Sequence, residues 1–259
     1  MPLIDGPDGA IEVQLTGRGT PVTVFAHGLG ACIDETRPFG SGVRGSRVFF
    51  HFRGHGATVG WESPWTYAAL AAELQTVAAA YGARRALGVS LGAGALLRAA
   101  ADTPAAFDRL VFVLPAAIDR PRVDAAVKRM QRQAEMVQRG DLDALAASLL
   151  GEQPPAVRDR ADVQVWARRQ ASRLSAPTVA RALRELSLQH PVESRSVLAR
   201  VRCPALVVGQ EGDAAHPASI ARKLAGALPT AELAMFDASG LAWNHRVELR
   251  AVISRFFDS

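Results

Sequence analysis

The chain contains few cysteines and no long apolar run, although it has 259 residues. Its two cysteines, Cys32 and Cys203, are far apart and match neither a metal-ligand spacing nor a Cys-x-x-Cys pair. No apolar run approaches the ~20 residues that a membrane-spanning helix needs. We therefore expect no metal, no cofactor and no membrane partner.

Lysine is also scarce, since it occurs only at Lys128 and Lys223, and arginine supplies the rest of the 30 basic side chains. The arginines are spread along the chain rather than clustered, and aromatic residues make up only 6%. A nucleic-acid surface needs a concentrated basic patch, so the charge of +5 predicts no nucleic-acid partner. Residues 1–6 show no basic region followed by an apolar stretch, and we expect a cytoplasmic protein. Its partner is expected to be a small-molecule substrate, and the sequence leaves the oligomeric state open.

Short apolar runs alternate with helical patterns in two parts of the chain. Helices are predicted at residues 66–81 and 91–101, where apolar side chains share one face. Strands are predicted at 11–15, 22–26, 47–52, 85–89, 110–114, 205–209 and 231–236. This alternation is typical of an α/β fold with a mostly parallel central sheet that is covered on both faces.

The pattern changes to helices alone between these two parts. We therefore expect residues 1–115 and 198–259 to form the core, with an all-helical cap inserted at 116–197.

The most informative segment is 86–95, where an apolar strand, a sharp turn and a helix follow one another. Ser90 lies at the centre of the pattern Gly-x-Ser-x-Gly that runs from Gly88 to Gly92. A serine at such a strand-to-helix turn has a strained backbone, and its hydroxyl projects above the sheet. The residues two positions before and two positions after Ser90 must be almost without side chains, because the strand and the helix crowd together there.

Four segments together resemble the α/β-hydrolase family over essentially the full length of the chain. His27-Gly28-Leu29-Gly30 resembles the loop after the third strand, and residues 88–92 resemble the nucleophile elbow. Residues 52–58 resemble an Asp-x-Arg-Gly-x-Gly-x-Ser segment, although the usual aspartate position holds His51 or Phe52. Residues 202–217 resemble the strand and loop that carry the acid.

The resemblance implies a catalytic triad in the order nucleophile, acid, histidine. Ser90 would be the nucleophile, and Asp213 would be the acid, with Glu211 as its nearest competitor. The histidine is expected after the last strand, where the usual position holds Leu241 and the next histidine is His245.

We predict His245 as the base, with His216 or no competent base as the alternatives. At a helix amino terminus, the protonated form of His245 would be disfavoured.

The backbone amides of Leu29 and Leu91 would form the oxyanion hole. His27 is expected to hydrogen-bond the neighbouring loop backbone, and Trp65 and Trp243 to line the substrate site.

The resemblance thus implies a serine hydrolase that acts through an acyl-enzyme. Few charges lie in the loops expected around the active site, so we expect it to cleave an uncharged or modestly hydrophobic ester, lactone or thioester. The alternative is a non-hydrolytic, ligand-binding or cyclase-like member of the family, which Leu241 at the histidine position supports.

Overall fold

The computed structural model describes residues 1–59, 62–122 and 124–259. Its centre is an eight-stranded sheet with the order β1-β2-β4-β3-β5-β6-β7-β8. Neighbouring strands from β4 to β8 are parallel, whereas β1 and β2 join the edge in antiparallel orientation. The strands are β1 (Leu3–Gly6), β2 (Gly9–Thr16), β3 (Val22–Ala26), β4 (Ser46–Phe50), β5 (Arg85–Val89), β6 (Arg109–Val113), β7 (Ala205–Gln210) and β8 (Ala231–Phe236).

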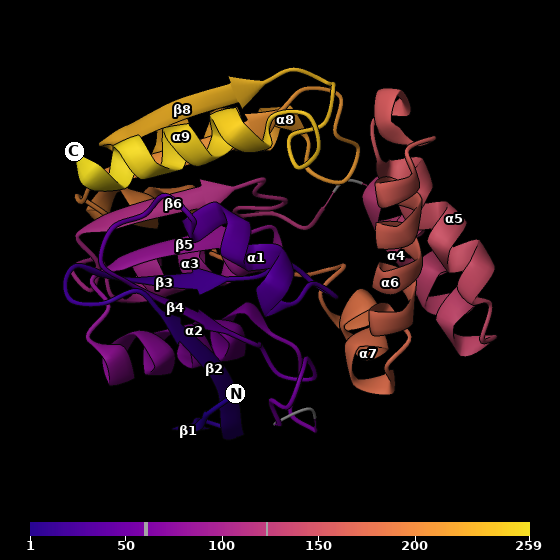
Figure 1. Ribbon diagram of the computed structural model, residues 1–259, viewed down its shortest axis with the longest axis horizontal. Helices are drawn as coiled ribbons and strands as arrows, with labels where there is room; N and C mark the ends of the chain where they lie inside the picture. Colours follow the sequence, from indigo (N-terminus) through magenta and orange to yellow (C-terminus); the bar gives the residue numbers. More distant parts are fainter. Residues whose placement is uncertain (60–61, 123) are drawn as a thin grey trace.

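Helices cover both faces of the sheet (Figure 1). One buried apolar cluster joins the sheet to α2 (Tyr67–Tyr81), α3 (Leu91–Asp102) and α8 (Ala218–Ala227). A second cluster joins the other face to α1 (Ile33–Gly40) and α9 (Arg246–Asp258). The central strands are buried on both sides, as their continuous apolar sequences predict.

The limits of α2 show how local sequence signals set a helix. The Thr66 side chain accepts a hydrogen bond from the Ala69 N–H at 3.1 Å and so caps the amino terminus. Gly82, with φ of 63°, ends the helix in the left-handed conformation that glycine adopts at little cost.

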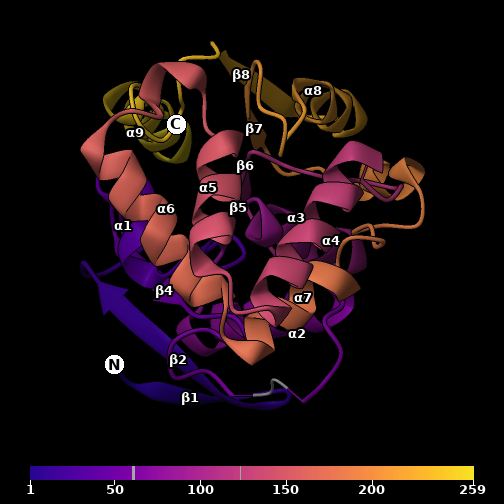
Figure 2. The same cartoon turned by 90° about the vertical axis from the view of Figure 1, so that its right-hand side faces the viewer.

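A group of helices between β6 and β7 lies at the carboxyl ends of the parallel strands. It consists of α4 (Asp124–Gln138), α5 (Leu142–Glu152), α6 (Ala161–Leu174) and α7 (Pro177–Glu185), which we call the helical cap. The strand arrowheads point toward it in Figure 1, and Figure 2 looks onto it with the sheet behind. The predicted fold class, a doubly covered parallel sheet with an inserted helical cap, is confirmed. The boundaries of a separate cap domain at 116–197 stay a prediction.

Two elements were not predicted from the sequence. β1 is a short edge strand, and α1 contains Pro38 in its interior, a residue that normally interrupts a helical pattern. No helix in the described ranges has both the length and the apolar character needed to span a bilayer.

Candidate active site

Ser90 lies at the turn between β5 and α3, with φ of 52° and ψ of −105°. A positive φ is unfavourable for serine, and the surrounding packing holds the turn in place. The Ser90 N–H donates to the Val113 carbonyl at 2.9 Å. A Cβ atom on Gly88 would lie 2.2 Å from the Gly92 carbonyl oxygen, and one on Gly92 would lie 2.3 Å from the Ala26 carbonyl oxygen. Any side chain at either glycine would therefore push the strand and the helix apart.

A histidine and an aspartate from the loop after β7 complete a hydrogen-bonded chain with Ser90. His216 Nε2 lies 2.8 Å from Ser90 Oγ, and His216 Nδ1 lies 3.0 Å from Asp213 Oδ2. Asp213 Oδ1 accepts the backbone N–H groups of Ala215 and His216 at 2.8 and 2.9 Å. Burial raises the pKa of Asp213, but its interactions with His216 and these N–H groups outweigh burial and lower the pKa overall. A carboxylate that stays ionised can orient the imidazole and stabilise its protonated form.

His245, which the sequence predicts as the base, does not contact Ser90. Its Nδ1 lies 3.0 Å from Glu248 Oε2, and its Nε2 lies 2.9 Å from Asp237 Oδ1 and 2.8 Å from Ser239 Oγ. The hydrogen bond to Asp237 is the main reason that the pKa of His245 is raised. The protonated form of His245 is thus favoured by its contacts with Asp237 and Glu248, the opposite of what its place at a helix amino terminus predicts. The prediction that His245 pairs with Ser90 is therefore wrong, since His216 contacts Ser90 instead.

Leu241 occupies the position where the resemblance places a histidine, and it is part of the hydrophobic core. The Leu241 side chain is buried, and its backbone N–H donates to Gln210 Oε1 at 2.5 Å. Glu211, the competitor for the acid role, forms an ion pair with Arg222 of α8. The loop after β7 thus supplies both Asp213 and His216, and the loop after β8 supplies neither.

Two backbone N–H groups lie where an oxyanion hole was predicted. Leu91 begins α3, and no acceptor for its N–H or for that of Leu29 lies within the described residues. The Leu29 carbonyl accepts a hydrogen bond from the Gln170 side chain at 2.8 Å, which ties this loop to the helical cap. The amino terminus of a helix carries partial positive charge, so an anion is favoured beside the Leu91 N–H.

Three buried histidine rings hold the loop that contains Leu29. Each ring accepts one backbone N–H at Nε2: His27 from Phe52 at 3.0 Å, His55 from Gly30 at 2.9 Å and His51 from Ile33 at 3.1 Å. His51 Nδ1 lies 2.7 Å from Glu12 Oε2. In this chain, the His51 imidazole thus connects Glu12 with the Ile33 backbone near the position where the resembled segment has an aspartate. His27 contacts loop backbone, as expected.

Burial lowers the pKa of His27 and of His55, the latter to about 4. Both rings therefore stay neutral and keep their acceptor nitrogens.

A cavity of about 290 Å³ opens above Ser90 and His216 and is lined by residues that include Leu29, Asp213 and Trp243. Trp243 lies beside this cavity as predicted, with its indole N–H donating to Gln153 Oε1 at 2.9 Å. Trp65 does not line it, because its side chain is fully buried between the core and the helical cap and its indole N–H donates to the Thr178 carbonyl.

One arginine just before the helical cap and one within α4 support the loop that carries His216. Arg122 Nη1 donates to the Ala215 carbonyl at 3.2 Å, and Arg129 Nη2 donates to the Ala214 carbonyl at 3.1 Å. These contacts were missed, since the residues are more than 80 positions apart in the chain. Within residues 1–59, 62–122 and 124–259, no group of three or more histidine, cysteine, aspartate or glutamate side chains could hold a metal ion.

The sequence and the fold were compared with known proteins. The model of the alpha/beta hydrolase family matches residues 23–251. The search among curated proteins found no match.

Solved structures share the fold over essentially the whole chain. An alpha/beta hydrolase enzyme, MGS-M2, from a Medee basin deep-sea metagenome library superposes with a TM-score of 0.86 at 16% identity, covering 100% of this chain and 98% of that one. An esterase from Exiguobacterium antarcticum gives 0.83 at 17% identity, covering 99% of both chains. The enol-lactonase from Burkholderia xenovorans LB400 gives 0.81 at 18% identity, covering 100% of both. The chain belongs to the alpha/beta hydrolase family.

Proposed function

We propose that the protein is a serine hydrolase that cleaves an ester, a lactone or a thioester through an acyl-enzyme. Ser90 is the nucleophile, His216 the general base and Asp213 the acid that orients it. The observation that carries this proposal is the 2.8 Å contact between Ser90 Oγ and His216 Nε2, with Asp213 bonded to the opposite ring nitrogen. A serine hydroxyl needs such an adjacent base to become a nucleophile.

In the first half of the reaction, Ser90 Oγ attacks the substrate carbonyl and His216 Nε2 takes its proton. The N–H groups of Leu29 and Leu91 hold the oxygen that becomes negatively charged. Protonated His216 then gives the proton to the leaving alcohol or thiol, and an acyl group remains on Ser90. Asp213 stabilises the imidazolium and keeps Nδ1 protonated.

In the second half, water enters the cavity and loses a proton to His216 as it attacks the acyl carbonyl. The bond to Ser90 Oγ breaks, His216 returns the proton to the serine, and the carboxylic acid leaves. The cavity of about 290 Å³ accommodates only a small group at the reacting carbonyl. The esterase and the enol-lactonase with the same fold agree with oxygen esters or lactones as substrates.

A fluorophosphonate probe tests the proposal directly, because it phosphonylates only an activated serine. We expect a mass increase of one phosphonyl group on the peptide that contains Ser90, and no increase in the Ser90→Ala variant. Folded wild-type protein that stays unlabelled would contradict the hydrolase function. The non-hydrolytic alternative depended on Leu241 at the usual histidine position, and it loses this support because His216 provides a base from another loop.

A further inference from the structure

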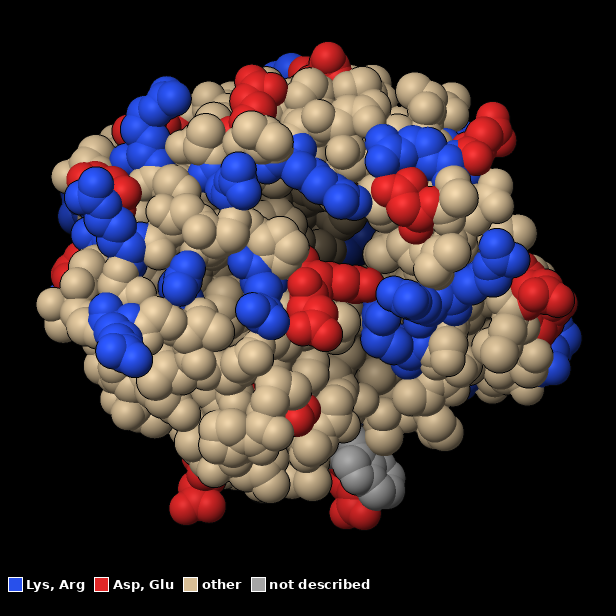
Figure 3. Space-filling model, in the orientation of Figure 1, with Lys and Arg blue, Asp and Glu red and all other residues tan. Residues whose placement is uncertain are grey.

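A second, larger chamber adjoins the cavity above Ser90. It has a volume of about 670 Å³ and lies between α1, α6 and α9, where the space-filling view shows a hollow bordered by basic side chains and, on part of its rim, by acidic ones (Figure 3). The chamber and the inner cavity share the residues Glu35, Phe39, Gln153, Trp166, Ala242 and Trp243. A molecule whose carbonyl lies at Ser90 can therefore extend past Trp243 into the outer chamber.

The walls of this chamber are largely apolar. Phe39 comes from α1, Trp166 from α6 and Leu249 from α9. The rings of Trp166 and Trp243 meet edge to face with their centroids 5.7 Å apart. Such a surface favours an apolar or aromatic body in the ligand.

The side chains that line the chamber include more basic groups than acidic groups. Arg169, Arg246 and Arg250 line it, and none of them has a carboxylate within ion-pair distance among the described residues. The two carboxylates on the same walls belong to Glu35 and Asp162. Each is already bound, Glu35 by Arg173 and Asp162 by Arg160. Three arginines and two carboxylates thus line the chamber, and its walls carry an excess of positive charge, although Arg169 still interacts electrostatically with Glu35 and Arg246 with Asp162.

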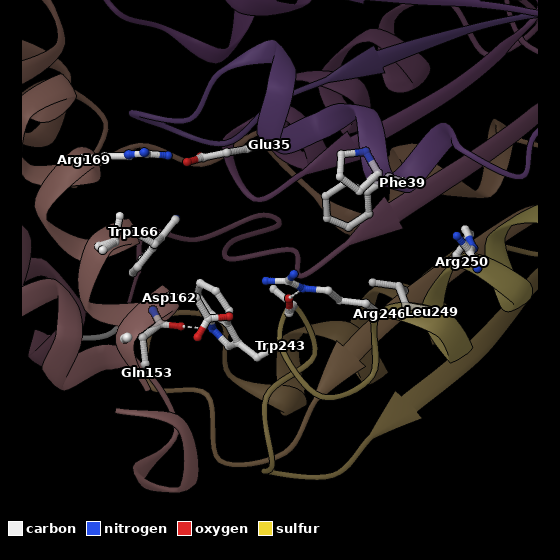
Figure 4. Close-up of a pocket in the computed structure, with 14 residues that line it drawn as sticks. Glu35, Phe39, Gln153, Asp162, Trp166, Arg169, Trp243, Arg246, Leu249 and Arg250 are labelled. Carbon is white, nitrogen blue, oxygen red and sulfur yellow. Dashed lines mark hydrogen bonds between the residues drawn. The ribbon is translucent and has the colours of Figure 1, made fainter. Parts of the chain in front are cut away.

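Two of these arginines face the chamber from opposite sides. Arg169 comes from α6 and Arg246 from the start of α9 (Figure 4). The guanidinium carbon of Arg246 lies 5.1 Å from the ring centroid of Trp243, and its Nε donates to the Ala242 carbonyl at 2.5 Å. Its two terminal amino groups have no acceptor in the described part of the chain, and they remain available for a bidentate bond with a carboxylate.

We propose that the outer chamber binds the carboxylate of an amphipathic organic acid, held by Arg246 and Arg169 with its apolar body against Trp166 and Trp243. It further follows, resting on the proposed function, that the substrate is an ester, lactone or thioester with a free carboxylate at the end remote from the reacting carbonyl. This proposal differs from the sequence-based expectation of an uncharged substrate, because the positive charges come from α6 and α9 and not from the loops around Ser90.

The binding part is tested without catalysis, in the Ser90→Ala protein by calorimetry. The probes are phenylbutyrate and its neutral amide, phenylbutyramide, which have the same body. We expect the acid to bind about tenfold more tightly than the amide, as for a hydrogen bond to a charged group. Arg246→Gln or Arg169→Gln should remove most of this preference. Arg255→Gln is the matched control, because Arg255 is exposed on α9 outside the chamber, and it should keep the preference.

Equal affinity for the acid and the amide, or no binding of either at millimolar concentration, would overturn the proposal. Inorganic phosphate should not displace phenylbutyrate at equal concentration, since it has no apolar body. Displacement would overturn the role of the aromatic wall.

The substrate part is tested with para-nitrophenyl monoesters of dicarboxylic acids from glutaric to sebacic acid, each beside its neutral methyl diester. We expect one chain length at which kcat/KM for the acid exceeds that for the neutral ester by about tenfold or more. Arg246→Gln should lower this ratio by about tenfold, and Arg255→Gln should not change it. A ratio near one at every length would overturn the substrate class, even if phenylbutyrate binds. If no ester is cleaved and the fluorophosphonate does not label Ser90, the proposed function fails, and calorimetry still decides the carboxylate site.

Discussion

His216 Nε2 lies 2.8 Å from Ser90 Oγ, although 126 positions separate the two residues in the chain. Ser90 follows β5, and His216 follows β7, which is separated from β5 only by β6 in the sheet. Parallel strands bring their carboxyl ends to one edge, so the two loops meet there. His216 therefore reaches Ser90 from the same loop as Asp213, and the loop after β8, which holds His245, is not part of this hydrogen-bonded chain.

The two histidine candidates can be separated by one pair of variants. His216→Ala should lower kcat/KM for a para-nitrophenyl ester by about 10³-fold or more, since Ser90 loses its base. His245→Ala should stay within a few-fold of wild type, because His245 contacts Asp237 and Glu248. The same pair should be compared for labelling rate with a fluorophosphonate. Equal losses in both variants would reject the assignment of His216.

Replacing Gly92, in the first turn of α3 after Ser90, by alanine should destabilise the protein. In Gly92→Ala, the new Cβ would lie 2.3 Å from the Ala26 carbonyl oxygen, so the backbone must shift. We expect a loss of about 1–3 kcal/mol in the free energy of unfolding, together with slower labelling of Ser90. Gly226→Ala in α8 is the matched control, since nothing lies within 4 Å of its Cβ. This variant should be neutral or more stable by up to about 1 kcal/mol. Urea unfolding of both variants measures the difference, and a stable, fully labelled Gly92→Ala protein would contradict the account of the elbow.

The stability of the fold should depend on the ion pair between the buried Arg53 and Glu73. The Arg53 side chain is fully buried, with Nε 2.6 Å from Glu73 Oε1 and Nη2 2.6 Å from Asp8 Oδ2. Glu73→Gln would leave part of this charge uncompensated, and we expect a loss of about 3–5 kcal/mol in the free energy of unfolding.

The control for that variant is an exposed pair of the same type. Asp102→Asn breaks the pair with Arg98, which is partly exposed on α3, and should cost about 1 kcal/mol or less. If the two variants lost the same stability in urea, burial would not be the cause.

Stability should fall in acid because the histidines that hold the loop containing Leu29 are buried in their neutral form. The pKa of His55 is lowered from 6.5 to about 4, so the unfolded chain binds more protons than the folded one between these values. Stability is therefore fully present above pH 6.5 and is lost as the pH falls toward 4, by up to about 3 kcal/mol from this group. His27, whose pKa is also lowered by burial, acts in the same direction.

The variant His55→Gln tests this account, because glutamine can accept the Gly30 N–H but does not titrate. It should show a smaller loss of stability between pH 6.5 and 4.5 than wild type, measured as the shift of the urea midpoint. Parallel pH profiles for the two proteins would show that His55 is not the titrating group.

The sequence predicted the elements that local patterns specify. The turn at Ser90 was visible in the sequence because the start of α3 packs tightly against the ends of both β5 and β3. These contacts require glycine at positions 88 and 92, which leaves a short motif. The alternation of apolar runs with helical patterns likewise predicted the parallel sheet, and its replacement by helical patterns alone predicted the helical cap. α1 escaped prediction because Pro38 interrupts its pattern, and Trp65 was misplaced because a tryptophan near a functional loop can equally be buried.

By itself, the sequence determined the family fold, the sharp turn at Ser90 and the loop that carries Asp213, since each leaves a pattern in residues close together in the chain. Only the tertiary structure decided that His216 contacts Ser90, that Leu241 is buried, and that arginines from α6 and α9 face one chamber. The reason is physical: a hydrogen bond between two loops depends on strand order and loop path, which no short motif encodes. The charge of the outer chamber likewise depends on ion pairs formed in the folded protein, such as those of Glu35 with Arg173 and of Asp162 with Arg160.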